Sequence, residues 1–227
     1  SIVPTPPSSP TRLEIELQHQ ERWYARAIEQ RFFDREGFRQ LIAWNLRALR
    51  EAVPVRPDMR VLSLGCGLGD YERALASSVN RLIAVDLSST AVAEAQRRAA
   101  ADGVHNLEFR CAPIETLEFS PGSFDLVYAF GVLHHLSHDS RHELFHLAHA
   151  WLDVGGWLYC RDPNARGVLR RTTGVAPLGQ TGFHSPVERE LDPQDTVAEM
   201  RGAGFEETRV DYTDVLGGPL PWILATR

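Results

Sequence analysis

Three alternating glycines and one aspartate form the clearest chemical pattern in the sequence. Segment 61–70 reads VLSLGCGLGD, so an apolar run leads into Gly65, Gly67 and Gly69. Glycine lets the backbone approach a ligand closely, and the helix expected next offers unpaired N–H groups. Asp86 ends the following apolar run, 21 residues after Gly65, where a carboxylate can accept both ribose hydroxyl hydrogens. The spacing therefore predicts a nucleoside site.

The glycine spacing also separates two classes of nucleoside cofactor. A dinucleotide-binding loop reads GxGxxG, which would put its third glycine where this chain has Asp70. The observed pattern is GxGxG, so a nicotinamide cofactor fits poorly and is kept as the alternative. A tight glycine turn without a ligand is the remaining interpretation.

Two adjacent histidines and a later aspartate could perform acid–base chemistry. His134 and His135 follow the apolar run 124–130, and Asp162 follows the run 157–161. A neutral imidazole is basic near pH 7, and a carboxylate can orient it and stabilise its protonated form. We expect His134 to act as a base, with His135 as the alternative. The competing interpretation is that one of the pair only shapes the turn.

The elements that must position these residues alternate between short β-like runs and amphipathic helices. Strands are expected at 60–64, 81–86, 107–111, 124–130 and 157–161, with helices between them. This alternation predicts parallel pairing with right-handed crossovers, hence an α/β fold. A helix at 193–202 is followed by strands at 205–212 and 220–227, which a tight turn at 217–219 makes antiparallel.

The remaining chain divides into three further segments. Residues 1–10 are rich in Pro and Ser and predict a flexible tail, and 11–52 predicts a cap of two helices broken near 34–37. The domain proper is expected at 53–227, and its insertion at 163–192 is expected to be a substrate loop. Trp23 and Tyr24 either cover the site or simply pack the cap onto the domain.

Composition limits the partners. The 227 residues carry a net charge of −6 and lack an overall basic footprint, which argues for a small-molecule substrate rather than a nucleic acid. The three cysteines are widely spaced, which favours a reducing cytoplasm and predicts neither a disulfide framework nor a zinc site. No run is long and apolar enough to span a membrane. The histidines at 138, 142, 146 and 149 predict a solvated helix face, so no metal is expected. Nothing indicates an oligomeric state.

Five motifs in order resemble the class I S-adenosylmethionine (SAM) dependent methyltransferases of the small-molecule type, related to the ubiquinone and menaquinone enzymes. They are VLSLGCGLG, IAVDLSSTAVAEA, FSPGSFDLVYAFGVLHHL, WLDVGGWLYCRD, and GFEETRVDY followed by PWILATR. The resemblance implies a Rossmann-like seven-stranded sheet, mostly parallel with an antiparallel C-terminal hairpin and helices on both faces. It also implies SAM as cofactor. The family usually carries an acid where this chain has Ser63.

The same resemblance implies contacts and a reaction. It assigns cofactor binding to Ser63, Gly65, Cys66, Gly67, Gly69, Asp86, Leu87, Pro113, Ile114, Phe130 and Gly131. The His134–His135 pair with Asp162 resembles sugar O-methyltransferases of natural-product pathways, in which one histidine of the pair serves as base. O-methylation of a small hydroxylated molecule is therefore expected. The alternatives are N- or C-methylation of a small metabolite, and a non-catalytic protein that binds SAM.

Overall fold

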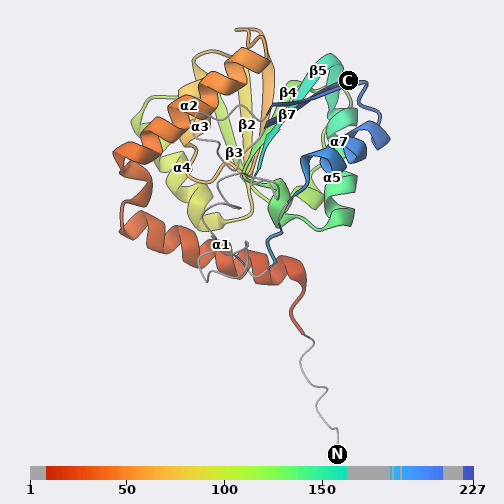
Figure 1. Ribbon diagram of the computed structural model, residues 1–227. Coiled ribbons are helices and arrows are strands. Elements are labelled where there is room, and N and C mark those ends of the chain that lie inside the picture. Colours follow the sequence, from red (N-terminus) through yellow and green to blue (C-terminus); the bar gives the residue numbers. More distant parts are fainter. Residues whose placement is uncertain (1–8, 163–184, 186, 190, 212–221) are drawn as a thin grey trace, which may run out of the picture.

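Seven strands form one mixed sheet in the order β3-β2-β1-β4-β5-β7-β6 (Figure 1). The computed structural model describes residues 9–162, 185, 187–189, 191–211 and 222–227. Its strands are β1 (Arg60–Leu64), β2 (Arg81–Asp86), β3 (Leu107–Cys111), β4 (Phe124–Phe130), β5 (Leu152–Arg161), β6 (Glu207–Asp211) and β7 (Trp222–Thr226). The first five run parallel, and β7 pairs antiparallel with both β5 and β6. The predicted Rossmann-like sheet with an antiparallel C-terminal pair is confirmed.

Helices cover both faces of this sheet, as Figure 1 shows. They are α1 (Arg12–Glu29), α2 (Glu36–Ala52), α3 (Asp70–Ala76), α4 (Ser89–Ala101), α5 (His138–Trp151) and α7 (Pro193–Gly202), with short 3-10 turns η1 (Phe32–Asp34), η2 (Ile114–Thr116) and η3 (Leu133–His135). Two apolar clusters result. One joins α2 and α3 to the sheet through residues such as Leu46 and Leu75, and the other joins α5 and α7 through Phe145 and Met200.

The order of the strands reverses between β1 and β4. The chain proceeds from β1 outward through β2 and β3, then returns to the other side of β1 with β4 and β5. Open α/β sheets bind ligands at such a point, beyond the carboxyl ends of the strands. The glycine loop follows β1 and η3 follows β4, so the two predicted chemical motifs meet at this edge.

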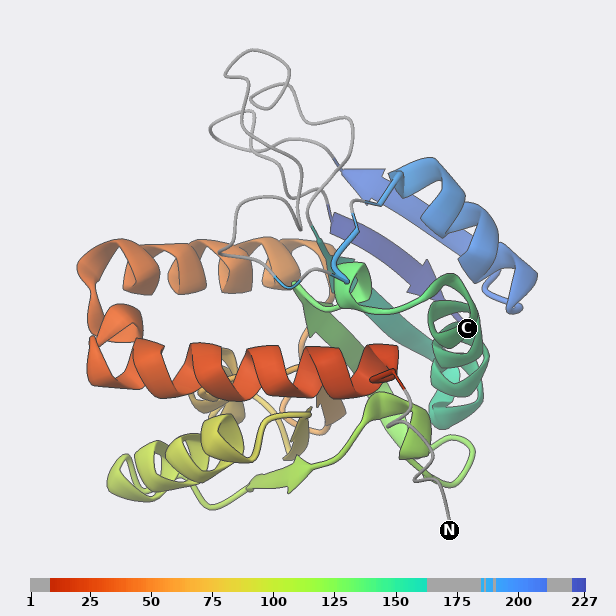
Figure 2. The same cartoon turned by 90° about the horizontal axis from the view of Figure 1, so that it is seen from below.

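Helix α1 lies across this carboxyl edge (Figures 1 and 2). It begins at a capping box, in which the Thr11 hydroxyl accepts from the Glu14 N–H while the Glu14 carboxylate accepts from the Thr11 N–H. The helix ends before Arg31, whose φ of 49° is left-handed and turns the chain toward α2. The turn falls slightly earlier than the break predicted near 34–37.

Three element boundaries differ from the sequence prediction. Strand β5 begins at Leu152 instead of position 157, because Leu152 already pairs with Phe124 before the register shifts. Strand β6 begins at Glu207, because Phe205 is a buried core residue that closes the end of α7. Strand β7 begins at Trp222. The predicted turn at 217–219, most of the insertion 163–192, and residues 1–8 of the tail lie outside the described residues.

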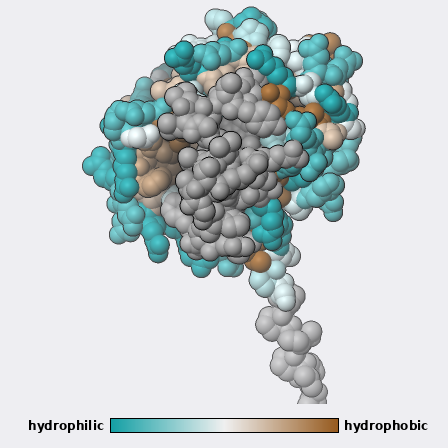
Figure 3. Space-filling view, viewed as in Figure 1, coloured by the Kyte–Doolittle hydropathy of each residue, from teal (hydrophilic) through white to brown (hydrophobic). Residues whose placement is uncertain are grey.

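Polar residues cover most of the described surface seen in Figure 3. His138, His142 and His146 are exposed on α5, as the solvated-face interpretation predicts, whereas His149 packs against Phe205 at a centroid distance of 5.2 Å. Within the described ranges, no helix combines the length and apolar character needed to cross a membrane.

Candidate active site

A cavity of about 770 Å³ opens at the carboxyl edge of the sheet, beneath α1. Its floor comes from the loops after β1, β2, β3 and β4, and its roof comes from α1, η1 and α2. The predicted site residues in its wall are Gly65, Asp86, Leu87, Pro113, Ile114, Gly131, His134 and His135. The other predicted cofactor residues do not line the cavity as described: Ser63, Cys66, Gly67, Gly69 and Phe130.

The glycine loop is held tightly against β2. The backbone N–H groups of Gly65 and Cys66 both donate to the Val85 carbonyl, at 2.7 and 3.0 Å. Gly65 has a left-handed φ of 69°, and a Cβ at this position would lie 2.3 Å from Val132 Cγ2. Only glycine fits here without displacing the chain that leads into η3. The loop therefore packs directly against the segment that carries the histidine pair.

Asp86 connects this loop to helix α4. One of its carboxylate oxygens accepts from the Gly67 N–H at 2.8 Å, and the other accepts from the Ser88 N–H at 2.9 Å. A carboxylate offers about four acceptor positions, so both oxygens keep capacity for ribose hydroxyls. Burial raises the pKa of Asp86, although the two backbone donors oppose this effect. The residue thus shapes the cradle and keeps acceptors facing the cavity.

The space above the loop is partly occupied by Tyr24 of α1. A Cβ on Gly67 would lie 2.8 Å from the Tyr24 hydroxyl, so this phenol reaches down onto the loop. Burial, and then the charge of Asp86, raise the pKa of Tyr24 well above its ordinary value. Tyr24 therefore stays protonated and can donate to an anion such as the carboxylate of SAM. Leu87, Pro113 and Ile114 supply the apolar wall suited to an adenine ring.

Ser63 stands where the resemblance implies an acid, and an acid from α3, Glu72, lies directly beside it. The Ser63 hydroxyl donates to Glu72 Oε1 at 2.5 Å, and the Tyr128 hydroxyl donates to the same oxygen at 2.8 Å. Glu72 is 1% exposed, and burial raises its pKa to about 7. Sequence reasoning missed this residue. The sequence did contain a signal for it. Glu72 lies three and four residues before Leu75 and Ala76, so it falls on the same buried face of α3.

His134 and Asp162 come together as the sequence predicts. The Gly131 N–H donates to the Arg161 carbonyl at 2.7 Å, which ties the end of β4 to the end of β5. Asp162 Oδ1 then lies 2.8 Å from His134 Nδ1 and also accepts from the His134 backbone N–H. This contact favours the tautomer with hydrogen on Nδ1, so Nε2 keeps its lone pair. Burial and the charge of His135 outweigh Asp162 and lower the pKa of His134.

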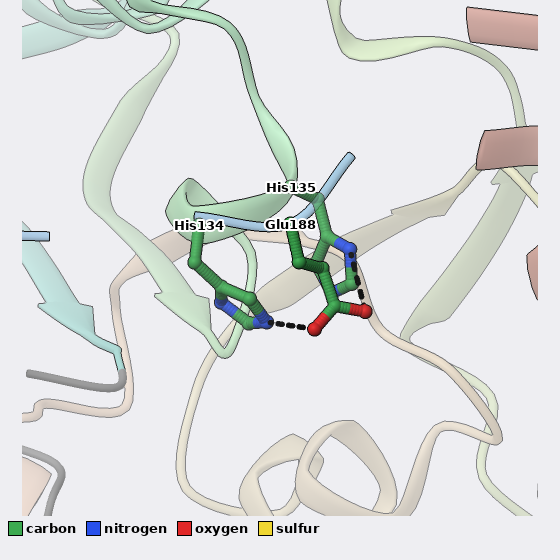
Figure 4. A group of neighbouring side chains, drawn as sticks. All are labelled: His134, His135 and Glu188. Carbon is green, nitrogen blue, oxygen red and sulfur yellow. Dashed lines mark ion pairs between the residues drawn. The ribbon is translucent and has the colours of Figure 1, made fainter. Parts of the chain in front are cut away.

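His135 has different partners, although its ring centroid is only 4.0 Å from that of His134. Its Nδ1 lies 2.8 Å from Glu16 Oε1 of α1 and 3.6 Å from Glu188 Oε1. The other oxygen of Glu188 lies 3.8 Å from His134 Nε2, so this carboxylate sits between the two rings (Figure 4). Burial lowers the pKa of His135, but Glu16 and then Glu188 outweigh it and raise that pKa. Sequence reasoning identified neither glutamate.

These contacts test whether the chain fits SAM. The glycine cradle, the buried Asp86 with free acceptor capacity and the apolar wall provide for the amino-acid end, the ribose and the adenine respectively. The cavity also reaches the histidine pair and an aromatic roof of Trp23, Tyr24, Phe32, Phe33 and Phe38. The residues present fit a nucleoside cofactor and leave room beside it for a second molecule.

A mixed seven-stranded sheet with this loop and this acid at its switch point defines a Rossmann-like nucleoside-binding protein. Comparison with known proteins narrows the class. A family model described as a methyltransferase domain matches residues 61–156. The matched segment contains the glycine loop, Asp86 and the histidine pair, so the chain is similar to methyltransferases over the residues that form the predicted SAM site.

The individual relatives differ in the acceptor they name. The ubiquinone biosynthesis O-methyltransferase of Bordetella avium is 27% identical over 212 residues, covering 89% of this chain and 86% of that protein. Phosphoethanolamine N-methyltransferase 1 of Arabidopsis thaliana is 26% identical over 159 residues, covering 68% of this chain, which spans only 31% of that protein. The solved DhpI-SAM-HEP complex matches 97% of this chain and 100% of its own, with a TM-score of 0.71 and 22% identity.

Proposed function

We propose that this protein transfers the methyl group of SAM to a hydroxyl of a small molecule, with His134 as general base and Asp162 as its orienting partner. The observation that carries this proposal is the 2.8 Å contact between His134 Nδ1 and Asp162 Oδ1, because His134 lines the same cavity as Gly65 and Asp86. It leaves His134 Nε2 as the basic atom. A base whose second nitrogen is oriented by a carboxylate is the arrangement that acid–base sites require.

Each group of cavity residues has its own part in the proposed reaction. Asp86 and the glycine loop would hold the cofactor, which supplies a methyl carbon already activated by its sulfonium. Alignment of acceptor, methyl and sulfur can account for about 7–11 kcal/mol of the barrier. His134 takes the hydroxyl proton at Nε2, and Asp162 stabilises the resulting imidazolium. Helix α1 excludes water from the cavity. General-base assistance of this kind contributes about 10²–10⁴-fold.

A second candidate function is N-methylation of a small amine. Glu16 and Glu188 are buried carboxylates in the cavity wall, and two such groups attract a cationic acceptor. The N-methyltransferase relative supports keeping this candidate. It differs from O-methylation in its acceptor. A cationic ammonium would first release its proton to a nearby base such as Glu16, Glu188 or His134, and the neutral amine would then attack the methyl carbon without further base assistance.

The test combines binding and turnover. Isothermal titration with SAM, S-adenosylhomocysteine and NADH checks the cofactor class. A labelled-methyl assay with a panel of phenols, sugars, quinones and amines then identifies the acceptor. We expect His134→Asn and His134→Ala to lose about 10²-fold in kcat while retaining S-adenosylhomocysteine affinity. Full turnover in both variants would refute the base assignment, and methylation of amines alone would favour the second candidate.

A further inference from the structure

The two imidazoles of the site contact carboxylates from three separate segments. His134 is paired with Asp162 after β5, whereas His135 is paired with Glu16 of α1 and with Glu188 of the segment 185–189. Two imidazolium rings at 4.0 Å would repel each other strongly, so one proton on the pair disfavours a second. Asp162 at His134 and Glu16 at His135 both lie 2.8 Å from Nδ1, but Glu188 also approaches Nδ1 of His135, at 3.6 Å, whereas it faces the other nitrogen of His134 at 3.8 Å. Two carboxylates thus converge on one nitrogen of His135, and this convergence places the proton on His135.

We propose that Glu16 is a positioning residue of the methyl transfer: its ion pair fixes His135 as an imidazolium, and that neighbouring charge keeps His134 neutral and ready to accept a proton. The inference rests on the proposed function and extends it to the cap helix. Because Glu16 reaches His135 only when α1 lies over the site, the base becomes ready when the cap is seated.

Other contacts of α1 support this coupling between cap and base. The Arg12 guanidinium donates to the carbonyls of His135 and Val187, at 2.9 and 2.6 Å, one turn before Glu16. Glu16 Oε1 also accepts from Gln20 at 2.7 Å, which fixes its side chain. At the other side of the cavity, Glu21 accepts from the Ser89 N–H at the start of α4. The helix is therefore anchored on both sides, with Glu16 held over His135.

The surroundings of His135 contain few competing charges. The titratable or charged groups that face it come from α1 (Arg12, Glu16 and His19), β2 (Asp86), η3 (His134), the residue after β5 (Asp162) and the segment 185–189 (Glu188). Glu16 and Glu188 are the two that approach its Nδ1 within 4 Å. Burial and the charge on His135 are the two largest causes that lower the pKa of His134. The charged groups around His134 and His135 therefore favour the same protonation states as the contact distances do.

The experiment measures the protonation of both rings directly. Imidazole ¹⁵N spectra of the S-adenosylhomocysteine complex are recorded against pH for the wild type, Glu16→Gln, Glu188→Gln and Glu21→Gln, with His134 and His135 assigned by single replacements. In Glu16→Gln we expect His135 to lose its proton about one pH unit or more lower than in the wild type, and His134 to titrate at a higher pH. Glu188→Gln should also make His135 lose its proton at a lower pH, by less because its contact is longer, but it should not raise the titration of His134, because Glu188 faces His134 Nε2 as well.

Glu21→Gln is the matched control on the same helix. It weakens the docking of α1 onto α4 but removes no charge beside His135, so it should raise the KM for SAM without moving either titration. Because Glu188 does not belong to α1, a shift in Glu188→Gln cannot arise from a loosened cap. With a methylated acceptor in hand, the acid limb of kcat/KM should move to higher pH in Glu16→Gln and stay in place in Glu21→Gln.

Three results would overturn the proposal. Unchanged titrations in Glu16→Gln would remove its basis, and so would equal shifts in Glu21→Gln. His134, His135 and Glu188 each have one nitrogen or oxygen atom that could bind a metal ion, and these three atoms lie within 4.8 Å of one another. Stoichiometric divalent metal in the purified protein, with loss of turnover on its removal, would show that an ion takes the place of the proton. If the titrations shift but no acceptor is methylated, only the proposed function fails.

Discussion

Glu72 should make the protein lose stability as pH rises, and one substitution should remove that loss. Burial raises the pKa of this carboxyl from an ordinary 4.5 to about 7. A carboxyl whose pKa is raised on folding stabilises the folded state only while it is protonated. Its contribution is complete below pH 4.5 and is lost as pH rises through about 7. At about 1.4 kcal/mol per pH unit, the difference amounts to about 3 kcal/mol.

Glu72→Gln removes the charge and keeps the hydrogen-bond acceptor. A glutamine oxygen can still accept from Ser63 and Tyr128, which both contact Oε1. Between pH 5 and pH 8 the wild type should therefore lose about 2–3 kcal/mol more stability than the variant. For a chain of this size that corresponds to about 5–10 °C in Tm.

Urea unfolding and thermal scans at pH 5, 6, 7 and 8 without cofactor provide the measurement. The exposed Glu118→Gln is the control, because it should follow the wild type at every pH. We expect the variant to start less stable at pH 5, because its amide takes the place of Glu72 Oε2, a buried atom with no hydrogen-bond partner among the described residues. That offset leaves the slope unaffected. Parallel stability curves for Glu72→Gln and the wild type would refute the reasoning, since the carboxyl would then ionise without penalty.

Three further predictions concern the cradle and the base. Asp86→Asn should weaken S-adenosylhomocysteine binding by about tenfold or more in calorimetry, because an amide cannot accept from Gly67, Ser88 and both ribose hydroxyls; unchanged affinity would place the ribose elsewhere. Gly65→Ala should cost about 2 kcal/mol or more in urea unfolding, since its Cβ meets Val132 at 2.3 Å with a left-handed φ; a neutral effect would contradict the close packing. Asp162→Asn should lower kcat by about 10²-fold without weakening S-adenosylhomocysteine binding, and a loss in binding alone would make Asp162 a structural residue.

Much of the fold follows from local sequence signals. Strands β1 to β4 match their predicted bounds because β1, β2 and β4 are short, mainly apolar runs and β3 alternates apolar with charged residues, and each run is closed by Gly, Asp or a turn. Asp86 and the glycines could be located because their roles depend on neighbours within the same βαβ unit. The error at the start of β5 has the opposite cause: Leu152 joins the sheet by pairing with Phe124, and the glycines at 155 and 156 bend the strand without ending it.

The acidic partners of the histidines could not be found in the same way. Glu16 lies 119 positions before His135, and Glu188 lies within the segment that the sequence marks only as an insertion. The periodicity of a sequence shows which residues lie on the same face of a helix, but it does not show which distant element packs against that face. A partial signal existed, because Glu16, His19, Gln20, Trp23 and Tyr24 follow helical spacing and all line the cavity. An aromatic stripe that also carries an acid points toward a site more than toward a core.

The placement of these carboxylates suits the charge movement of the proposed reaction. When His134 accepts the hydroxyl proton, a positive charge appears between Asp162 and Glu188, and the total charge of the protein groups and ligands in the cavity stays the same. Both carboxylates already face the ring, at 2.8 and 3.8 Å, so little reorganisation is needed to stabilise the new imidazolium. His135 supplies the opposing influence, because its charge makes protonation of His134 temporary. The base must accept a proton during transfer and release it before the next turnover, so it requires both influences. The carboxylates that provide them come from α1, from the residue after β5 and from the segment 185–189.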